Sequence, residues 1–135
     1  MRPLEGIKVL DMSRVLAGPF AGRILHDLGA EVVKIEPPEG DVTRHWGKVR
    51  AGLAGYYTQQ NIGKRNVCID LRAEGGTEII RRLATEADVL IENFRPGVMK
   101  KYGLSYEDLK PLNEKLIMLS ISGFGQQGPE STRAA

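Results

Sequence analysis

The feature that most constrains the fold is a strand–turn–helix–strand pattern near the start of the sequence. Apolar residues at positions 7–10 lead into a Gly-Pro turn, a segment with helical spacing follows, and a second apolar run ends on Glu36. This order is typical of a βαβ unit, in which a helix connects two parallel strands. The pattern therefore predicts an α/β protein built on an open, mainly parallel sheet.

The turn of this unit argues against a dinucleotide ligand. In the Gly-x-Gly-x-x-Gly fingerprint of dinucleotide-binding folds, the middle glycine lets the backbone touch a pyrophosphate. When Gly22 is aligned with the third glycine, Ala17 and Pro19 stand at the other two positions. A proline ring at the middle position fills the space and removes an N–H donor. We therefore expect that this turn does not bind NAD.

Further strands and helices are predicted from apolar spacing and turn residues. The expected strands span residues 7–12, 31–36, 66–70, 88–92 and 116–122. The first helix is expected from Pro19 to a cap at Gly29, and the second over residues 74–87. A third helical segment begins at Ser105, which forms a capping box with Asp108.

Helical periodicity also predicts which side chains face the core. The residues expected to face inward are Phe20, Ile24, Leu25 and Leu28 in the first helix, and Ile79, Ile80, Leu83 and Ala87 in the second. Glu78, Arg81, Arg82 and Glu86 are expected to face water. The single cysteine, Cys68, lies in a strand-like run and is expected to be a buried, inert thiol.

Composition and charge exclude several classes of function. The 135 residues carry a formal net charge of +2, which is too small to argue for nucleic-acid binding. No apolar run approaches the roughly 20 residues of a membrane-spanning helix, and the start has no signal-peptide profile. One cysteine and two histidines without ligand spacing predict no metal site. We therefore expect a cytoplasmic protein that binds neither nucleic acid nor a membrane.

Two segments interrupt the alternating pattern. Residues 37–66 are rich in glycine and charge, but Trp46, Tyr56 and Tyr57 predict that the segment is folded, because such side chains need burial. The sequence ends in a glycine-rich loop that no further strand or helix follows. A compact domain rarely stops at such a loop, so we expect the chain to be the front part of a longer protein.

Three segments at predicted strand ends are candidates for a binding site. Asn93, Phe94 and Arg95 offer an amide, an aromatic face and a guanidinium, which suit a nucleotide, although Asn93 could also simply cap a turn. The segments "SRVLAGP" and "SGFGQQGP" follow two other strands. Because parallel strands end at one edge of a sheet, we expect the three segments to converge there.

Other polar residues leave two interpretations open. Lys64 and Arg65 precede one predicted strand and Arg72 follows it, so these charges are either solvated or bracket a phosphate. His26 is expected at the surface of the first helix. His45, beside an aromatic residue in the long segment, is the better site candidate.

Several separated motifs carry a family resemblance. They are "LEGIKVLDMSRVLAGPFAGRILHDLGAEVVKIEPPEGDVTR", "NIGKRNVCIDLR" and "ENFRPGVMKKYGLSYEDLKPLNEKLIMLSISGFGQQGP". In this order they resemble the amino-terminal part of the class III CoA-transferases, the family of formyl-CoA transferase and carnitine CoA-transferase. The resemblance implies a Rossmann-like α/β domain with helices on both faces of the sheet, formed by residues 1–135 of a longer subunit. It also implies an interlocked homodimer.

The resemblance implies which residues bind coenzyme A, which is a substrate here and not a resident cofactor. It places Arg14, Val15, Leu16, Ala17 and Pro37 near the adenosine, Ile69, Arg72, Asn93 and Phe94 along the nucleotide, and Lys101 and Arg133 near the phosphates. Formyl-CoA transferases have a histidine, a glutamine and an arginine where this chain has Arg14, Leu16 and Pro37. These departures argue against formyl or oxalyl specificity.

The resemblance also implies a mechanism. In the family an aspartate carboxylate attacks an acyl-CoA, and the resulting anhydride and aspartyl-CoA thioester pass CoA to an incoming carboxylic acid. The match places that aspartate beyond residue 135, so Asp11, Asp27, Asp41, Asp70, Asp88 and Asp108 do not correspond to it. A CoA-transferase is therefore expected, with an acyl-CoA racemase of the same superfamily and a non-catalytic CoA- or nucleotide-binding module as alternatives.

Overall fold

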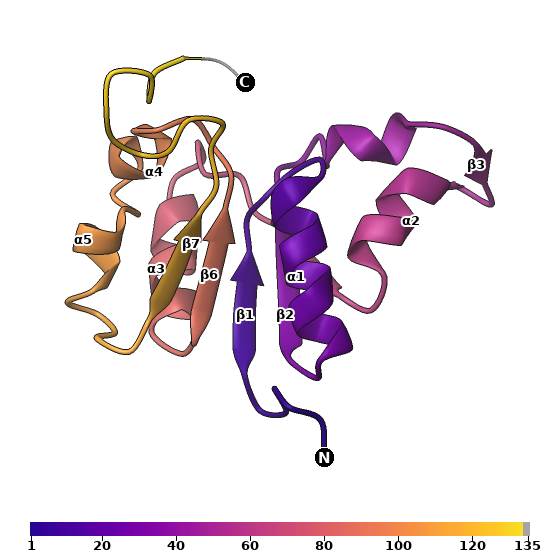
Figure 1. Ribbon diagram of the computed structural model, residues 1–135, viewed down its shortest axis with the longest axis horizontal. Helices are drawn as coiled ribbons and strands as arrows, with labels where there is room; N and C mark the ends of the chain where they lie inside the picture. The colour runs from indigo at the N-terminus through magenta and orange to yellow at the C-terminus, as the bar shows by residue number, and fades with distance from the viewer. Residues whose placement is uncertain (134–135) are drawn as a thin grey trace.

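A five-stranded parallel sheet forms the centre of the molecule (Figure 1). The computed structural model describes residues 1–133, and residues 134 and 135 of the predicted domain lie outside the described residues. The strands are β1 (Lys8–Asp11), β2 (Glu31–Glu36), β5 (Arg65–Cys68), β6 (Val89–Glu92) and β7 (Ile117–Ser120). Their order across the sheet is β5-β2-β1-β6-β7, and every pairing is parallel. The predicted open parallel sheet is confirmed.

The strand order reverses beside β1, because the chain builds outward through β2 and β5 and then returns to the other side of β1 to add β6 and β7. β1 pairs with β2 on one side and with β6 on the other, so that Leu10 lies opposite both Val33 and Leu90. The carboxyl ends of the strands therefore share one edge. In open sheets of this kind the ligand-binding crevice lies at that edge, where the strand order reverses.

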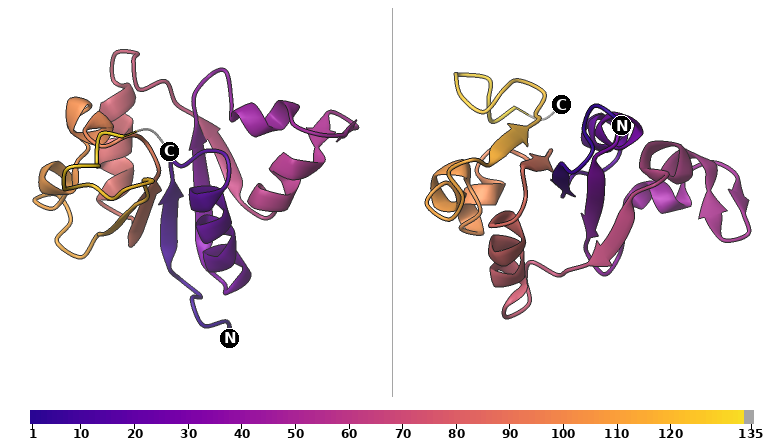
Figure 2. Two further views of the ribbon diagram at one scale, coloured as in Figure 1. Left: turned by 45° about the horizontal axis from the view of Figure 1, so that its top comes forward. Right: turned by 90° about the horizontal axis from the view of Figure 1, so that it is seen from below.

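Helices cover both faces of the sheet, as predicted (Figure 2). One face carries α1 (Ala17–Asp27), and the other carries α3 (Gly76–Ala84), α4 (Val98–Lys101) and α5 (Tyr106–Leu109). Strand side chains alternate between the two faces, so Val9 and Ile91 pack on the α1 side while Leu10 and Leu90 pack on the α3 side. The result is two hydrophobic cores, one on each face of the sheet.

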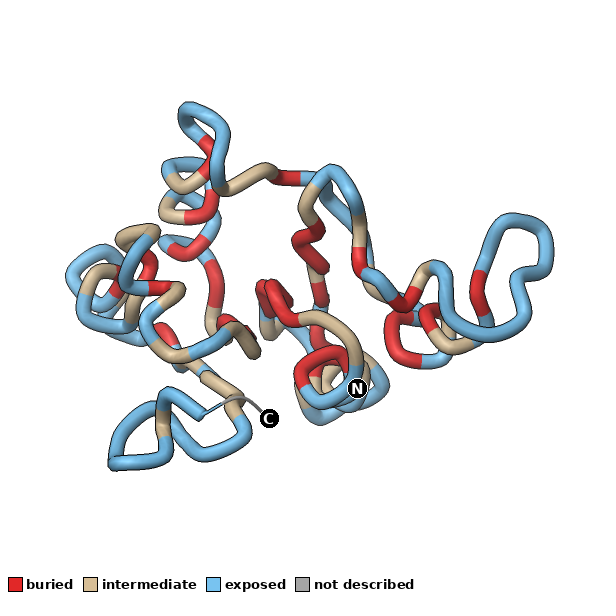
Figure 3. The backbone as a smooth tube through the Cα atoms, turned by 90° about the horizontal axis from the view of Figure 1, so that it is seen from above, coloured by how far each residue is buried: buried red, intermediate tan, exposed pale blue. Residues whose placement is uncertain are grey.

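The segment between β2 and β5 is folded, as its aromatic residues predict. It contains a 3-10 helix, η1 (Val42–His45), a short hairpin of β3 (Val49–Arg50) and β4 (Leu53–Ala54), and α2 (Gly55–Asn61). The Trp46 and Tyr56 rings pack against each other at a tilt of 53°, with centroids 5.6 Å apart. Figure 3 shows this segment extending to one side of the sheet, with its hairpin largely exposed. The same figure shows buried residues gathered along the central strands.

The predicted inner stripe of the first helix is wrong. Phe20, Ile24 and Leu28 are exposed, and of the expected set Leu25 packs against the sheet. The buried face is set instead by Gly18 and Gly22, which let the helix backbone approach the end of β1. Small residues thus override the apolar stripe in choosing the inner face.

The ends of this helix differ in how well the sequence predicted them. The helix begins at Ala17, two residues before the expected start at Pro19. The first turn of the helix requires a glycine at position 18, because a Cβ there would clash with Ser13. At the other end Gly29 has the positive φ of 113° expected of a C-terminal glycine cap.

The second predicted helix is shorter than expected, and fewer of its side chains are buried against the sheet. It runs over Gly76–Ala84, and its buried residues Gly76, Ile80 and Ala84 recur every fourth position. Ile79 and Leu83, expected inside, are exposed, because the helix touches the sheet along one narrow stripe. Arg81, expected in water, is half-buried and donates a hydrogen bond of 2.8 Å to the carbonyl oxygen of Gly103.

Two smaller predictions also differ from the structure, while a third is confirmed. Cys68 is exposed, because β5 is an edge strand whose residues are all exposed. His26 is half-buried, with its ring packed against Gly63. The capping box of α5 is present, and the backbone N–H of Ser105 donates to Asp108 Oδ2 over 3.0 Å.

The close approach of α1 to the sheet leads to a prediction about Gly18. A Cβ at this position would lie 2.1 Å from the Cβ of Ser13, so one of the two segments must move to admit it. We expect Gly18→Ala to lower the free energy of unfolding by about 1–3 kcal/mol, as overpacking does. Gly55→Ala is the control, because its nearest neighbour would be an oxygen 3.9 Å away, and we expect no loss there. Equal denaturant midpoints for the two variants would contradict this packing.

Candidate functional site

A cleft of about 290 Å³ opens at the carboxyl edge of the sheet, beside the point where the strand order reverses. The ends of β1, β2, β5 and β6 all contribute to its lining. Five of the predicted CoA-binding residues line it, namely Arg14, Pro37, Ile69, Arg72 and Phe94. This position and mixed polar and apolar lining are those of a typical ligand site in an open α/β sheet.

One wall of the cleft joins the ends of β1 and β6. Asn93 Oδ1 accepts a hydrogen bond of 2.7 Å from the backbone N–H of Arg14, and Asn93 Nδ2 donates one of 2.8 Å to the carbonyl oxygen of Arg14. The Arg14 guanidinium lies over the Phe94 ring, 5.5 Å from its centroid. Two of the three predicted segments therefore meet, with a cation and an aromatic face side by side.

The opposite wall carries a second arginine that is already paired. Arg72 Nε lies 2.8 Å from Asp70 Oδ1, and Arg72 Nη2 lies 3.4 Å from Glu39 Oε2. The Arg72 side chain is 62% exposed, so solvent screens these ion pairs strongly. An incoming anion can therefore compete for this guanidinium at small cost.

The remaining predicted residues do not line this cleft. Val15, Leu16 and Ala17 lie on the turn that follows β1, where Leu16 is exposed just before α1. Lys101 is exposed at the last position of α4. Arg133 lies in the segment after β7, 5.2 Å from the centroid of the Phe124 ring, and pairs with Glu130 over 3.1 Å.

The third predicted segment shares the edge of the sheet but not the cleft. "SGFGQQGP" follows β7, and Gln126 and Gln127 line a separate cavity of about 420 Å³ together with Glu92 and Ser120. Burial raises the pKa of Glu92, against hydrogen bonds from Ser120 and the Phe94 N–H that lower it. The three segments therefore share one edge of the sheet, as expected, but the third lines a different cavity from the other two. His45, the other candidate, is exposed on η1.

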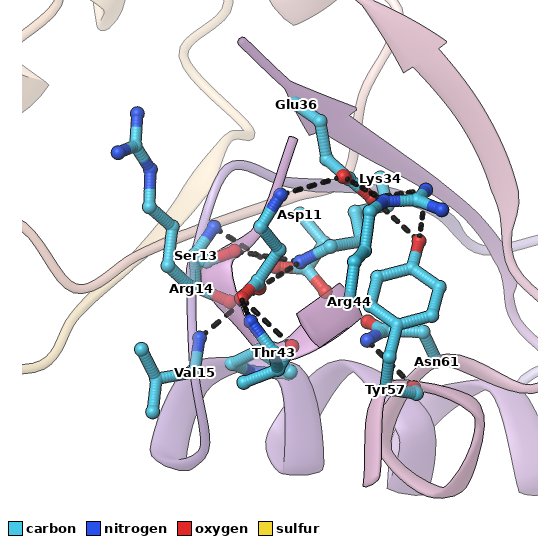
Figure 4. A network of polar contacts seen from close by, with 12 residues as sticks. Asp11, Ser13, Arg14, Val15, Lys34, Glu36, Thr43, Arg44, Tyr57 and Asn61 are labelled. Carbon is cyan, nitrogen blue, oxygen red and sulfur yellow. Dashed lines mark hydrogen bonds and ion pairs between the residues drawn. The ribbon is translucent and has the colours of Figure 1, made fainter. Parts of the chain in front are cut away.

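A group of buried charges lies between the sheet and α1, and the sequence analysis did not predict it (Figure 4). Lys64 Nζ lies 2.7 Å from Asp11 Oδ2, and their side chains are 1% and 0% exposed. Lys64 also donates to the carbonyl oxygen of Pro19 over 2.8 Å and to Asn61 Oδ1 over 2.9 Å. Burial lowers the pKa of Lys64, and the attraction of Asp11 opposes this shift. Lys64 is thus a structural cation, neither solvated nor a phosphate ligand.

A second buried ion pair lies next to the first. Lys34 Nζ is 3.3 Å from Asp41 Oδ2, with side chains 1% and 0% exposed, and it donates to the carbonyl oxygen of Ser13 over 2.8 Å. Asp41 accepts hydrogen bonds from the N–H and the hydroxyl of Thr43, at 3.0 and 2.8 Å. Burial alone would raise the pKa of Asp41, but these bonds and Lys34 outweigh it and lower the pKa.

Glu36, at the end of β2, holds a third polar cluster. Its carboxylate accepts hydrogen bonds of 2.7 Å from Arg44 Nε and 2.8 Å from the Asp41 N–H, and further bonds from Tyr57 and Asn66. Burial would raise the pKa of Glu36, but the bonds from Arg44, Tyr57 and Asp41 lower it to about 2. Burial and the carboxylate raise the pKa of Tyr57. Glu36 therefore fastens η1 and α2 to the sheet.

Within residues 1–133 no helix is long and apolar enough to cross a membrane. Over the same range, no group of three or more His, Cys, Asp or Glu residues is arranged to hold a metal ion. The cleft in this part of the chain is lined by two arginines, by three acidic residues that include Glu39 and Asp70 beside Arg72, by two aromatic residues and by apolar side chains.

Comparisons with known proteins identify the family. The model of CoA-transferase family III matches residues 4–135. The chain is 51% identical over 135 residues to succinate–glutarate CoA-transferase of Agrobacterium fabrum, a match that covers 94% of this chain and 34% of that protein. It is 46% identical over 136 residues to human succinyl-CoA:glutarate CoA-transferase, with 99% and 31% covered. This chain belongs to CoA-transferase family III, as the motifs predicted.

Solved structures agree with this assignment. The crystal structure of a CAIB/BAIF family protein from Brucella suis matches with a TM-score of 0.93 and 51% identity, over 98% of this chain and 36% of that one. The chain spans about a third of the length of the relatives that it matches. The family and the fold are thereby established for the part of the protein described here.

The Asp11–Lys64 pair leads to a stability prediction. Lys64→Met would leave Asp11 buried without its cation, and breaking a buried pair typically costs about 3–5 kcal/mol. Arg65→Met is the matched control, because Arg65 lies 3.9 Å from Glu31 with a side chain 78% exposed. We expect the control to change the free energy of unfolding by about 0.5 kcal/mol or less. Similar losses in the two variants, measured by urea denaturation, would contradict a structural role for Lys64.

The lowered pKa of Glu36 leads to a pH prediction. Because the pKa is about 2 in the folded protein and ordinarily 4.5, the ionised group stabilises the fold above about pH 4.5. This contribution, on the order of 3 kcal/mol, is lost as the pH falls from about 4.5 to about 2. We therefore expect Glu36→Gln to flatten the pH dependence of unfolding in this window. Parallel stability curves for Glu36→Gln and the wild type would contradict the prediction, and Glu31→Gln at an exposed site is the control.

Proposed function

We propose that this chain forms much of the coenzyme A site of a CoA-transferase, which moves CoA from an acyl-CoA to a free carboxylic acid. The observation that carries the proposal is the cleft at the carboxyl edge, which is lined both by Arg14, over the Phe94 ring, and by Arg72. Membership of CoA-transferase family III supports the same function. A nucleotide with several phosphates fits these groups better than a neutral ligand does.

Each part of CoA has a suitable partner in the cleft. The adenine can stack on the aromatic and apolar side chains of Phe94 and Ile69, which the structure leaves half-buried and buried at the lining. Phosphate oxygens are suited to the guanidiniums of Arg14 and Arg72, which bind such groups with charge-assisted hydrogen bonds. Lys101 and Arg133 lie outside the cleft, so in this proposal they contribute at most to the surrounding positive field.

The proposed chemistry is covalent catalysis by an aspartate outside this chain. Its carboxylate attacks the thioester carbonyl and expels CoA thiolate, which then attacks the aspartyl carbonyl of the mixed anhydride to release the first acid and leave an aspartyl-CoA thioester. The incoming carboxylate displaces CoA in the reverse sequence. Within residues 1–133, Asp11 and Asp41 are poor candidates for this nucleophile, because each is paired with a buried lysine.

The proposal extends to the substrates and the assembly of the complete protein. Two relatives, of Agrobacterium fabrum and of human origin, are named as succinate–glutarate and succinyl-CoA:glutarate CoA-transferases. On this basis we propose a dicarboxylic acid as acceptor and succinyl-CoA as a donor. As the family resemblance implies, we propose that the complete protein acts as a homodimer in the cytoplasm.

Calorimetric titration of the complete natural protein tests the site. We expect CoA to bind more tightly than NAD, and Phe94→Ala to weaken CoA binding about tenfold through loss of an aromatic wall. Phe20→Ala is the matched control, because this exposed ring on α1 lies outside the cleft and should leave the affinity unchanged. Tighter binding of NAD than of CoA would overturn the proposal. Exchange of labelled CoA between succinyl-CoA and free acids distinguishes a transferase from a racemase, which would instead invert the α-carbon of a branched acyl group.

A further inference from the structure

The turn between β1 and α1 has a backbone conformation that its sequence does not favour. Val15 has a φ of 70°, and within residues 1–133 Ala51 is the only other non-glycine residue with a positive φ. This left-handed region is an outlier for a β-branched residue, because the side chain crowds its own backbone. Contacts elsewhere in the protein must therefore hold the turn in place.

Side chains from both neighbours of β1 supply those contacts. Asn93, after β6, accepts from the N–H of Arg14 over 2.7 Å and donates to its carbonyl oxygen over 2.8 Å. Asp41, after β2, accepts from the N–H of Val15 over 3.1 Å. Three consecutive polar groups of the backbone, the N–H and carbonyl of Arg14 and the N–H of Val15, are thus bound from two sides.

The residue that holds Val15 is itself fixed by buried contacts. Lys34 pairs with Asp41 over 3.3 Å and also donates to the carbonyl oxygen of Ser13 over 2.8 Å. Asp41 is fully buried, and Thr43 donates two hydrogen bonds to its other oxygen. The turn is therefore held by groups that cannot easily move.

The held turn determines where Arg14 points. Its guanidinium lies 5.5 Å from the Phe94 centroid at the wall of the cleft. Among the charged groups of residues 1–133, no carboxylate lies within 4.0 Å of it, so its charge is available to an anion. If the turn relaxed to a common backbone conformation, this side chain would leave the wall.

We propose that Asn93 and Asp41 are positioning residues, which hold the Arg14–Val15 turn in its unfavourable conformation and so aim Arg14 at the ligand. Asn93 acts through the backbone of Arg14, to which both its amide oxygen and its amide nitrogen are bonded. This inference rests on the proposed function, since CoA is the ligand whose phosphate Arg14 would meet. It assigns a role in affinity to Asp41, which was not among the predicted ligand contacts.

The conformation of Val15 makes the proposal testable by rescue. Glycine adopts a positive φ without steric cost, so Val15→Gly should keep the turn populated even when a contact that holds it is removed. A side chain that touches CoA directly cannot be replaced in this way. If Asn93 holds the turn, Val15→Gly should restore CoA binding to an Asn93 variant. If Asn93 touches CoA directly, Val15→Gly should restore nothing.

The experiment measures the dissociation constant of CoA for the complete natural protein and for Asn93→Ala, Val15→Gly and the double variant. We expect Asn93→Ala to weaken CoA binding roughly tenfold in the wild-type background and by much less in the Val15→Gly background, as coupled residues do. Equal losses from Asn93→Ala in the two backgrounds would mean direct contact with CoA, and no loss in either would mean that the contact is dispensable. Either result overturns the proposal.

A second comparison tests Asp41 with a matched control. Asp41→Asn keeps the shape but weakens the bond to the Val15 N–H, and we expect a loss of CoA affinity that Val15→Gly reduces. Thr43→Val removes a hydroxyl bond to the other oxygen of the same carboxylate and should leave CoA affinity within about twofold, even if it lowers the melting temperature. Equal affinity losses in Asp41→Asn and Thr43→Val would overturn a specific role for Asp41.

These measurements distinguish a failure of the positioning role from a failure of the proposed CoA-binding function. If Asp41→Asn fails to fold, the Asn93→Ala and Val15→Gly set decides the question alone. If the wild-type protein does not bind CoA, the proposed function fails, and this proposal fails with it. If the wild type binds CoA but Val15→Gly gives no rescue, the positioning role alone is wrong.

Discussion

The structure depends on the pairing of charges that are buried beneath the carboxyl edge of the sheet. Lys64 with Asp11 and Lys34 with Asp41 are almost completely removed from water. Burying an unpaired charge is so costly that each partner must be present and well placed for the other to be tolerated. These pairs therefore fix the relative positions of β1, β2 and the segments that follow them.

This constraint links the long segment after β2 to the cleft. Glu36 and Asp41 bind η1 and α2 to the end of β2, while Asp41 reaches the turn after β1 and Asn93 reaches it from β6. A segment that reads as an interruption of the α/β pattern is thus part of the support for the binding edge. These polar contacts fix the turn that carries Arg14 to the lining of the cleft.

The sequence was informative where a local pattern decides the structure. The βαβ pattern, the glycine cap at Gly29 and the capping box at Ser105 were all correctly predicted, because each depends on residues that are close in the chain. The family motifs likewise identified CoA-transferase family III, and the Arg14 and Phe94 segments were correctly placed at one edge of the sheet.

Predictions failed where distant segments decide the outcome. The inner face of α1 is chosen by the close approach of Gly18 to Ser13, which no periodicity of that helix reveals. Cys68 is exposed because β5 lies at an edge, and strand order is not encoded locally. Lys64 looked like a surface charge because its partner, Asp11, is more than fifty residues away in the sequence.

A crystal structure of the complete natural protein with CoA bound tests the central claim most directly. The claim predicts the adenosine portion in the cleft, a phosphate oxygen within hydrogen-bonding distance of Arg14 or Arg72, and the Asn93 amide still bonded to the Arg14 backbone. CoA bound away from this cleft, with neither arginine in contact with it, would contradict the claim.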